Sequence, residues 1–184
     1  MEYRDVWVVS AFSILSALSY LFFDTLGPFN GNYYLDAFME LLSQLGGVYI
    51  YFALGGALVG YAFLYGRGEM KQKGAFFMFA LLVDTLLILA LKDLIGRERP
   101  IPETHYTKAF PSGHAANGIF TAKMLGDWYP KFRGGLYAFM LLCVSSRIYF
   151  GAHYLSDIFA GFAISYGTAV LWMWVYGKYV EKSE

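Results

Sequence analysis

Charged side chains are scarce in this sequence. Asp, Glu, Lys and Arg make up 15% of its 184 residues, whereas about a quarter is usual for a soluble domain. The 14 basic and 14 acidic residues balance, and the absence of a basic tail or stripe argues against a nucleic-acid partner. The single cysteine, Cys143, lies in an apolar run and excludes an intrachain disulfide. With 58% hydrophobic and 20% aromatic residues, the sequence is typical of a membrane protein.

Six apolar stretches are predicted to be membrane spans, for which about 17 to 25 residues are needed. They cover residues 6–23, 48–65, 74–91, 114–128, 135–150 and 158–176. Lys123 and Asp127 interrupt the fourth stretch. The first also resembles a secretory signal, but Glu2 and Asp5 offset Arg4 ahead of it, which favours a span.

A shorter segment, residues 35–45, has apolar residues at positions 35, 38, 39, 42 and 45, with polar residues between them. This period predicts an amphipathic helix in the membrane interface. We therefore predict an all-α integral membrane protein of one domain, residues 1–184. It consists of six transmembrane helices in a bundle plus this short interfacial amphipathic helix.

Basic residues are unevenly divided between the two sides of a six-span chain. Nine of the fourteen share one side: Arg4, Arg67, Lys71, Lys73, Lys123, Lys131, Arg133, Lys178 and Lys182. The positive-inside rule makes that side cytoplasmic and places both termini there. The other five, Lys92, Arg97, Arg99, Lys108 and Arg147, gather on the extracytoplasmic side, so we expect a functional reason for them.

A first motif, Lys92 to Pro100, follows the third predicted span. Lys92 and Arg99 are seven residues apart, so a helix that continues past the membrane places them on one face. Pro100 disfavours helix at the residue before it, which puts Arg99 at the helix end and lets it turn toward a ligand.

A second motif, Pro111-Ser112-Gly113-His114, opens the fourth stretch. Ser112 is a predicted helix N-cap, and Gly113 lets a ligand approach the backbone closely. Unpaired N–H groups and the positive end of the helix dipole favour an anion here. His114 is then placed beside that anion as a proton donor.

A third motif combines Ser146-Arg147 with His153 and Asp157. On a helix the last two lie four residues apart on one face, so the carboxylate can hold one ring nitrogen. The other nitrogen is left to attack a substrate. Together the three motifs supply cations, an oriented nucleophile and an acid, which is the set that phosphoryl transfer requires.

These motifs resemble the signature of the type 2 phosphatidic acid phosphatase superfamily. That signature is Lys, six residues, Arg-Pro; then Pro-Ser-Gly-His; then Ser-Arg, five residues, His, three residues, Asp. All eleven fixed positions occur here in order and with the family's internal spacing, from Lys92 to Asp157. The resemblance implies a helical bundle with an extracytoplasmic active site, and neither metal nor cofactor.

The resemblance also implies roles. His153 is the expected nucleophile, oriented by Asp157, and His114 protonates the leaving oxygen and then activates water. The expected phosphate-binding residues are Lys92, Arg99, Ser112, Gly113 and Arg147. Because one histidine must be neutral and the other protonated, we expect a bell-shaped pH–rate profile.

Some residues are left with two interpretations. Arg97 is a possible secondary phosphate-binding residue. His105, Glu103 and Lys108 either touch substrate or belong to a solvated loop. Asp84 lies within a predicted span, where an ionisable group is either functional or hydrogen-bonded between helices.

The expected partner is a lipid phosphate in the bilayer, and the oligomeric state is not predicted. Residues 24–45 contain no Lys or Arg and three acidic residues, Asp24, Asp36 and Glu40. A lipid with several further phosphates would favour cations there, so polyprenyl diphosphate is the preferred substrate. The alternatives are phosphatidylglycerol phosphate or lipid A 1-phosphate, a lipid-to-lipid phosphotransferase, and a non-enzymatic lipid transporter.

Overall fold

The structure is a computed structural model that describes residues 2–22, 24, 28–29, 31–65, 68–101 and 107–180. All of the regular structure in these ranges is helical, as predicted. The α-helices are α1 (Tyr3–Phe22), α2 (Tyr33–Leu45), α3 (Val48–Leu64), α4 (Gly68–Ile95), α5 (Gly113–Trp128), α6 (Arg133–Tyr149) and α7 (Leu155–Val175). A 3₁₀ turn, η2 (Pro130–Phe132), precedes α6, and a π-helical turn, η3 (Tyr176–Val180), continues α7.

The helices coincide with the predicted stretches, and local signals explain their ends. Asn32 caps α2, because its side chain accepts a hydrogen bond from Leu35 N at 3.2 Å. Gly46 and Gly47 separate α2 from α3. α4 begins six residues before the predicted span, and the Glu69–Lys73 ion pair lies four residues apart in its first turns.

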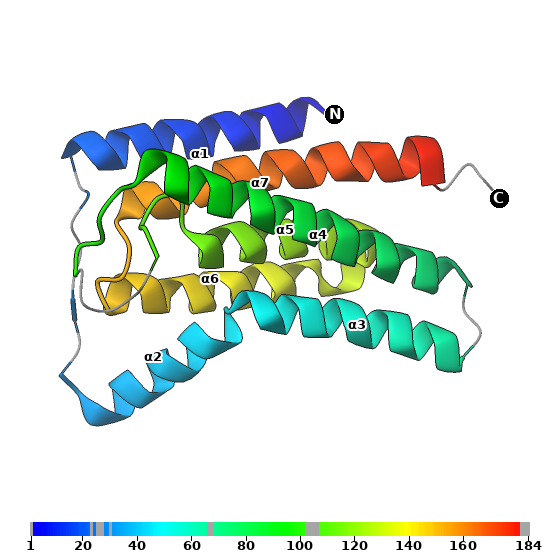
Figure 1. Cartoon of the computed structure of the whole chain (residues 1–184), viewed down its shortest axis with the longest axis horizontal. Helices are drawn as coiled ribbons and strands as arrows, with labels where there is room; N and C mark the ends of the chain where they lie inside the picture. The colour runs from blue at the N-terminus through cyan, green and yellow to red at the C-terminus, as the bar shows by residue number, and fades with distance from the viewer. Residues whose placement is uncertain are drawn as a thin grey trace.

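The helices run alongside one another, with α5 in the interior (Figure 1). α5 packs against α4, α6 and α7, while α1 lies on α7 and α3 lies on α4. α2 leaves the bundle at an angle and contacts α6 (Figure 1). α1 begins and η3 ends at the same end of the bundle, and the loops that carry the three motifs lie at the opposite end (Figure 1).

Close packing between α5 and α7 positions the motif end of the bundle. A Cβ on Gly161 of α7 would lie 2.7 Å from the carbonyl oxygen of Ser112 and 3.2 Å from Ala115 Cβ. Only glycine therefore permits this approach. Phe120, Met124 and Phe162 continue the buried core toward the other end.

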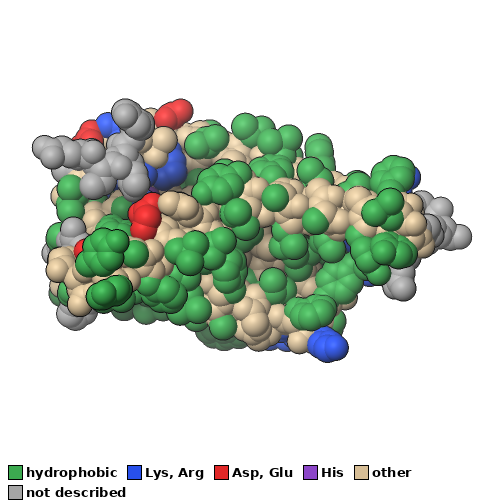
Figure 2. Space-filling model, turned by 90° about the horizontal axis from the view of Figure 1, so that it is seen from below, with side chains coloured by type: hydrophobic (Ala, Val, Ile, Leu, Met, Phe, Trp, Pro, Cys, Tyr) green, Lys and Arg blue, Asp and Glu red, His purple; other side chains and the backbone are tan. Residues whose placement is uncertain are grey.

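The outer surface is apolar. Hydrophobic side chains cover most of the face shown in Figure 2, and charged side chains gather toward the two ends of the molecule. On α4, Leu82, Leu86 and Leu89 are exposed. Such a surface suits lipid and not water.

The prediction of six spans is supported only in part. Within the described residues, three helical segments are long and apolar enough to cross a membrane, namely α1, α4 and α7 with η3. There are four if α2 and α3, bent by 52°, form one broken span. α5 and α6 have 16 and 17 residues, which at 1.5 Å per residue is about 24–26 Å against a hydrocarbon core of about 30 Å. Twelve of the sixteen α5 residues are buried by other helices, so this helix has little need of a lipid-facing surface.

Polar clusters account for the charges inside the predicted spans. Lys123 of α5 forms ion pairs with Asp5 at 3.1 Å and Asp127 at 2.8 Å. Asp84 of α4 accepts hydrogen bonds from Ser165 at 2.8 Å and from Thr168, both on α7. Of the two interpretations of Asp84, the structure therefore supports hydrogen bonding between helices.

Candidate active site

Lys92 and Arg99 reach one place from different elements. Lys92 lies in the last turn of α4, which ends at Ile95. Gly96 follows with φ +65°, a conformation that glycine adopts readily and that ends helices. The predicted continuation of the helix to Arg99 is therefore wrong, and Arg99 lies in the following loop. Both side chains are nevertheless buried, at 6% and 7% exposure.

The second motif opens α5, as predicted. Ser112 occupies the N-cap position, but its hydroxyl does not cap the helix; Oγ is buried without a hydrogen-bond partner among the described residues. Its backbone N–H donates instead to the carbonyl of Asp157 at 2.9 Å. This bond joins the start of α5 to the start of α7, and His114 follows in the first turn of α5.

The third motif spans the end of α6 and the start of α7. Arg147 lies in the last turn of α6, whereas His153 precedes α7, so the prediction that His153 and Asp157 share a helix is wrong. Asp157 Oδ2 accepts a hydrogen bond from Tyr154 N at 3.0 Å and lies 3.4 Å from His153 Nδ1. That contact is longer than a usual N–H···O bond of about 2.7–3.2 Å. The two side chains still meet, through the turn that opens α7.

A cavity of about 400 Å³ collects most of the predicted site. Its walls include Lys92, Arg99, Gly113, His114, Arg147 and His153, together with Ser43, Gln44, Gly47, Tyr49 and Thr107. Ser112 and Asp157 do not line it; both are fully buried beside residues that do. The structure thus brings six of the predicted residues to one cavity and places two directly behind them.

Two buried cations of this cavity, Lys92 and Arg99, are hydrogen-bonded to backbone carbonyls. Lys92 Nζ donates to the carbonyl of Lys108 at 2.8 Å. Arg99 donates to the carbonyls of Thr107 at 2.7 Å and Ala152 at 2.8 Å. Within the described ranges, neither Lys92 nor Arg99 forms an ion pair with a carboxylate. Buried charges require a counter-charge, so the cavity favours an anion such as a phosphate group.

His153 has the surroundings of a nucleophile. Its ring is buried, and Nε2 lies 3.1 Å from Arg99 Nη1 at the cavity wall. Burial lowers the pKa of His153 well below its usual value, and the positive charges of Arg99, Lys92 and Arg147 lower that pKa further. The imidazole is therefore neutral at neutral pH, which leaves Nε2 with a lone pair to attack an electrophile.

The end of α2 contributes residues that the sequence analysis missed. His114 Nε2 donates to the carbonyl of Ser43 at 2.8 Å, and Arg147 Nη1 donates to Ser43 Oγ. Ser43 is 71 residues from His114, so motif spacing gave no sign of this contact. The only signal was the Gly46-Gly47 pair, which marks a tight turn after the amphipathic helix.

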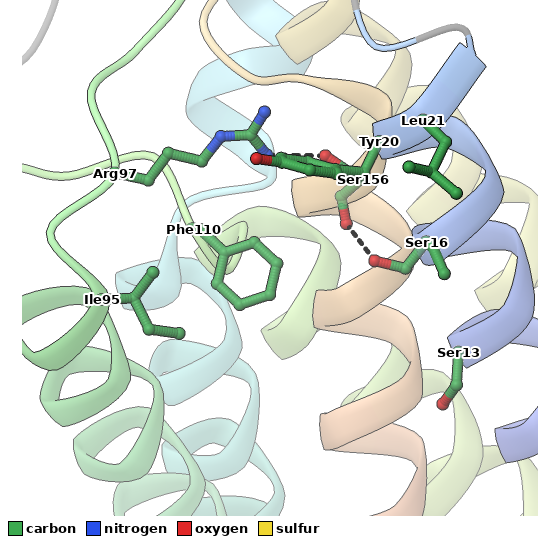
Figure 3. Close-up of a pocket in the computed structure, with 9 residues that line it drawn as sticks. Ser13, Ser16, Tyr20, Leu21, Ile95, Arg97, Phe110 and Ser156 are labelled. Atoms are coloured by element: carbon green, nitrogen blue, oxygen red, sulfur yellow. Dashed lines mark hydrogen bonds between the residues drawn. The ribbon is translucent and has the colours of Figure 1, made fainter.

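Arg97 does not line the cavity of about 400 Å³, which we call the phosphate cavity after the anion that it favours. Its guanidinium donates to Asp157 Oδ1 at 2.7 Å and pairs with Asp24. It lines a different cavity, of about 690 Å³, beside Tyr20 and Phe110 (Figure 3). The predicted secondary role in phosphate binding therefore has no support in this geometry.

The remaining loop residues contribute less. His105 and Glu103 lie outside the described residues. The side chain of Lys108 pairs with Glu98 at the surface, and only its backbone carbonyl contacts a site residue.

Comparison with known families and proteins is consistent with this site. A model of the PAP2 superfamily matches residues 73–181, a range that contains all three motifs. A lipid A 1-phosphatase of Rhizobium johnstonii is 33% identical over 104 residues, which cover 49% of this chain and 42% of that protein. A lipid A 1-phosphatase of Rhizobium etli is 30% identical over 119 residues, covering 57% and 51%. The chain thus spans about half the length of the curated relatives it matches.

Two solved structures share the fold. A transmembrane PAP2-type phosphatidylglycerolphosphate phosphatase from Bacillus subtilis superposes with a TM-score of 0.69 and 23% identity, covering 92% of this chain and 86% of the other. LpxE of Aquifex aeolicus gives a TM-score of 0.63 and 22% identity, with 91% and 94% covered. These likenesses support a multi-pass membrane bundle.

Proposed function

This chain belongs to the PAP2 superfamily, and on that premise we propose that it is a membrane lipid phosphatase that works through a phosphohistidine intermediate on His153. One observation carries the proposal: His153 Nε2 lies at the wall of a cavity where the buried cations Lys92 and Arg99 have no carboxylate partner among the described residues. A phosphate group supplies the missing charge and brings phosphorus to the nucleophile. The family is one of metal-independent phosphomonoesterases.

The first half of the reaction transfers the phosphoryl group to the enzyme. Lys92, Arg99 and Arg147 hold the phosphate oxygens, while His153 Nε2 attacks phosphorus. The N–P bond forms as the bond from phosphorus to the lipid oxygen breaks. Asp157, beside Nδ1, stabilises the positive charge that develops on the ring. His114 gives its proton to the leaving lipid oxygen.

The second half releases inorganic phosphate. His114, now neutral, takes a proton from a water molecule as that water attacks phosphorus. The N–P bond breaks, its electron pair returns to His153 Nε2, and the site regains its starting protonation. A second lipid hydroxyl in place of water would make the same site a phosphotransferase.

For the substrate, the comparisons favour the alternative over polyprenyl diphosphate. Both curated relatives are named lipid A 1-phosphatases, so we place a lipid phosphomonoester first and lipid A 1-phosphate at its head. Two of the three acidic residues of 24–45 do not oppose this assignment. Asp24 pairs with Arg97, and Asp36 accepts a hydrogen bond from Tyr149 at 2.6 Å, so both have partners away from the phosphate cavity.

The site end of the bundle is proposed to face the extracytoplasmic side. The sequence distribution of basic residues supports this orientation, because most of them belong to the end where α1 begins. Labelling of single cysteines introduced at Tyr3 and at Lys108 with an impermeant reagent tests it. Labelling of the Tyr3 position in intact cells would contradict the proposal.

The test of function is phosphate release by purified protein in detergent with a chelator present. The assay uses four substrates: lipid A, phosphatidylglycerol phosphate, phosphatidic acid and polyprenyl diphosphate. Each is given to the wild type, to His153→Gln and, as a surface control, to Glu98→Gln. We expect chelator-resistant release from a phosphomonoester that disappears only in His153→Gln. Labelled phosphate recovered in lipid would indicate a phosphotransferase. Lipid movement that survives His153→Gln, without phosphate release, would indicate a transporter.

A further inference from the structure

A second charged cluster, formed by Arg97, Asp24, Ser156 and Asp157, adjoins the phosphate cavity. The Arg97 guanidinium is its centre, donating to Asp157 Oδ1 at 2.7 Å and to Ser156 Oγ at 2.6 Å and pairing with Asp24. The two oxygens of Asp157 are thus divided: Oδ1 contacts Arg97, and Oδ2 lies on the His153 side. The cluster therefore reaches the nucleophile through one carboxylate.

Asp24 holds this cluster to the start of α7. Its Oδ1 accepts hydrogen bonds from Ser156 N at 3.2 Å and from Ser156 Oγ at 2.6 Å, across 132 residues of sequence. It thereby satisfies a backbone N–H in the first turn of α7, as a capping residue does. Ser16 of α1 adds a hydrogen bond to the carbonyl of Ser156 at 2.9 Å, which Figure 3 shows.

Aromatic rings fix the guanidinium in place. Its carbon lies 4.0 Å from the ring centroid of Tyr154 and 5.2 Å from that of Tyr20. The side chain is only 18% exposed, so little water screens its charge. Arg97 therefore holds one orientation between α1 and α7, pointing at Asp157 and not at the phosphate cavity.

We propose that Arg97, held by Asp24, is a positioning residue that keeps Asp157 ionised and turned toward His153, and so sets the pH below which His153 stops attacking. The inference rests on the proposed function of this site. Arg97 acts through Asp157 and has no contact with the phosphate cavity, so its loss should affect the rate of reaction more than substrate binding.

The charges around the pair give the sign of the effect. Asp157 faces Arg97 and Asp24, and His153 faces Arg99, Lys92, Arg147 and His114. Removing Arg97 leaves the negative charge of Asp157 without its positive partner, which makes both Asp157 and His153 easier to protonate. Removing the negative charge of Asp24 leaves Arg97 to act on Asp157 undiminished, which makes both harder to protonate. The acidic limb of the pH–rate profile should therefore move to higher pH when Arg97 is removed and to lower pH when the charge of Asp24 is removed.

The experiment measures kcat and KM against pH for the wild type, Arg97→Gln, Arg97→Lys and Asp24→Asn, in detergent. For Arg97→Gln we expect kcat to fall about 10-fold or more, with an unchanged KM and an acidic limb raised by about one pH unit. Arg97→Lys should restore part of both. Asp24→Asn keeps the acceptor oxygen for Ser156 and should lower the limb. Glu98→Gln removes an exposed carboxylate from the same loop and should leave the limb unchanged.

The outcomes separate this inference from the proposed function. A raised KM for Arg97→Gln with a stationary limb would make Arg97 a phosphate ligand and overturn the inference. Limbs that move in the same direction in Arg97→Gln and Asp24→Asn would reduce the cluster to a structural support. If Arg97→Gln does not fold, the inference is tested by Asp24→Asn alone: an acidic limb at lower pH supports it, and an unchanged or higher limb overturns it. A wild type without phosphate release, or an active His153→Gln, removes the proposed function and this inference together.

Discussion

Replacing Gly46 by alanine tests how closely the turn between α2 and α3 must approach His114. A Cβ at this position would lie 2.8 Å from His114 Cδ2 and 2.8 Å from Cys143 Cβ, whereas ordinary contact begins at 3.4 Å. Cys143 Cβ is fixed by the α6 backbone, so the turn or the imidazole must move by several tenths of an ångström. Ser43, whose carbonyl accepts the His114 hydrogen bond, lies in the last turn of α2 directly before this turn.

The expected loss follows from the sensitivity of catalysis to such displacements. A shift of about 1 Å lowers a rate by about 100-fold, so we expect Gly46→Ala to lower kcat by about 10- to 100-fold. Initial rates of phosphate release measure this, with thermal unfolding as the check on folding. Gly60→Ala is the matched control, because its Cβ meets nothing within 4 Å, and alanine in a helix should add about 0.5–1 kcal/mol of stability. A folded Gly46→Ala protein with the wild-type kcat would refute the reasoning.

Three further predictions use other parts of the molecule. Because burial and nearby cations lower the pKa of His153, its ring stays neutral in mild acid. The acidic limb of the kcat/KM profile should therefore lie below about pH 6.5, the usual pKa of histidine. An acidic limb above this pH would contradict the assignment of His153 as the nucleophile. Inorganic phosphate at about 100 times the wild-type Kd should raise the unfolding free energy of the wild type by about 2.7 kcal/mol, measured by thermal unfolding. At the same phosphate concentration, Arg99→Gln should gain less. Equal gains in the two proteins would mean that phosphate binds away from Arg99. Asp84→Val removes the carboxylate that accepts hydrogen bonds from Ser165 and Thr168, although Thr168 keeps the carbonyl of Ser165 as an acceptor at 3.1 Å. The change should lower stability by about 0.6–2 kcal/mol, measured by thermal unfolding. Asp84→Asn should lose less, and both variants should keep the wild-type kcat.

The helices were predictable because hydrophobicity is a local property of the chain. Each predicted apolar stretch corresponds to a helix, and glycine or asparagine lies at several helix ends, as at Asn32 and Gly46. The motif spacing likewise brought Lys92, Arg99 and His153 to one cavity. Errors arose where the chain leaves helical geometry. Gly96, with a positive φ, ends α4 before Arg99, and His153 precedes the first residue of α7.

Contacts between distant segments could not be predicted from one sequence. Ser43 meets His114 across 71 residues, and Asp24 meets Ser156 across 132. Neither residue belongs to a motif, and neither a serine on an amphipathic helix nor an aspartate in a loop has a distinguishing local signal. The predicted number of spans is supported only in part, for a related reason. Whether α5 needs a lipid-facing surface depends on the helices packed around it, and these cover most of its residues.

The cations that lower the pKa of His153 are also the groups that we propose to bind phosphate, and this double role has a kinetic consequence. In the free enzyme, Lys92, Arg99 and Arg147 disfavour a proton on the ring. A bound phosphate group neutralises much of their charge, so the imidazole becomes more basic and more nucleophilic once substrate is present. The acidic limb of kcat, which reports the enzyme–substrate complex, should then lie at higher pH than that of kcat/KM, which reports the free enzyme. Coincident limbs would mean that the phosphate does not offset these charges, and that Lys92 and Arg99 serve a purpose other than binding it.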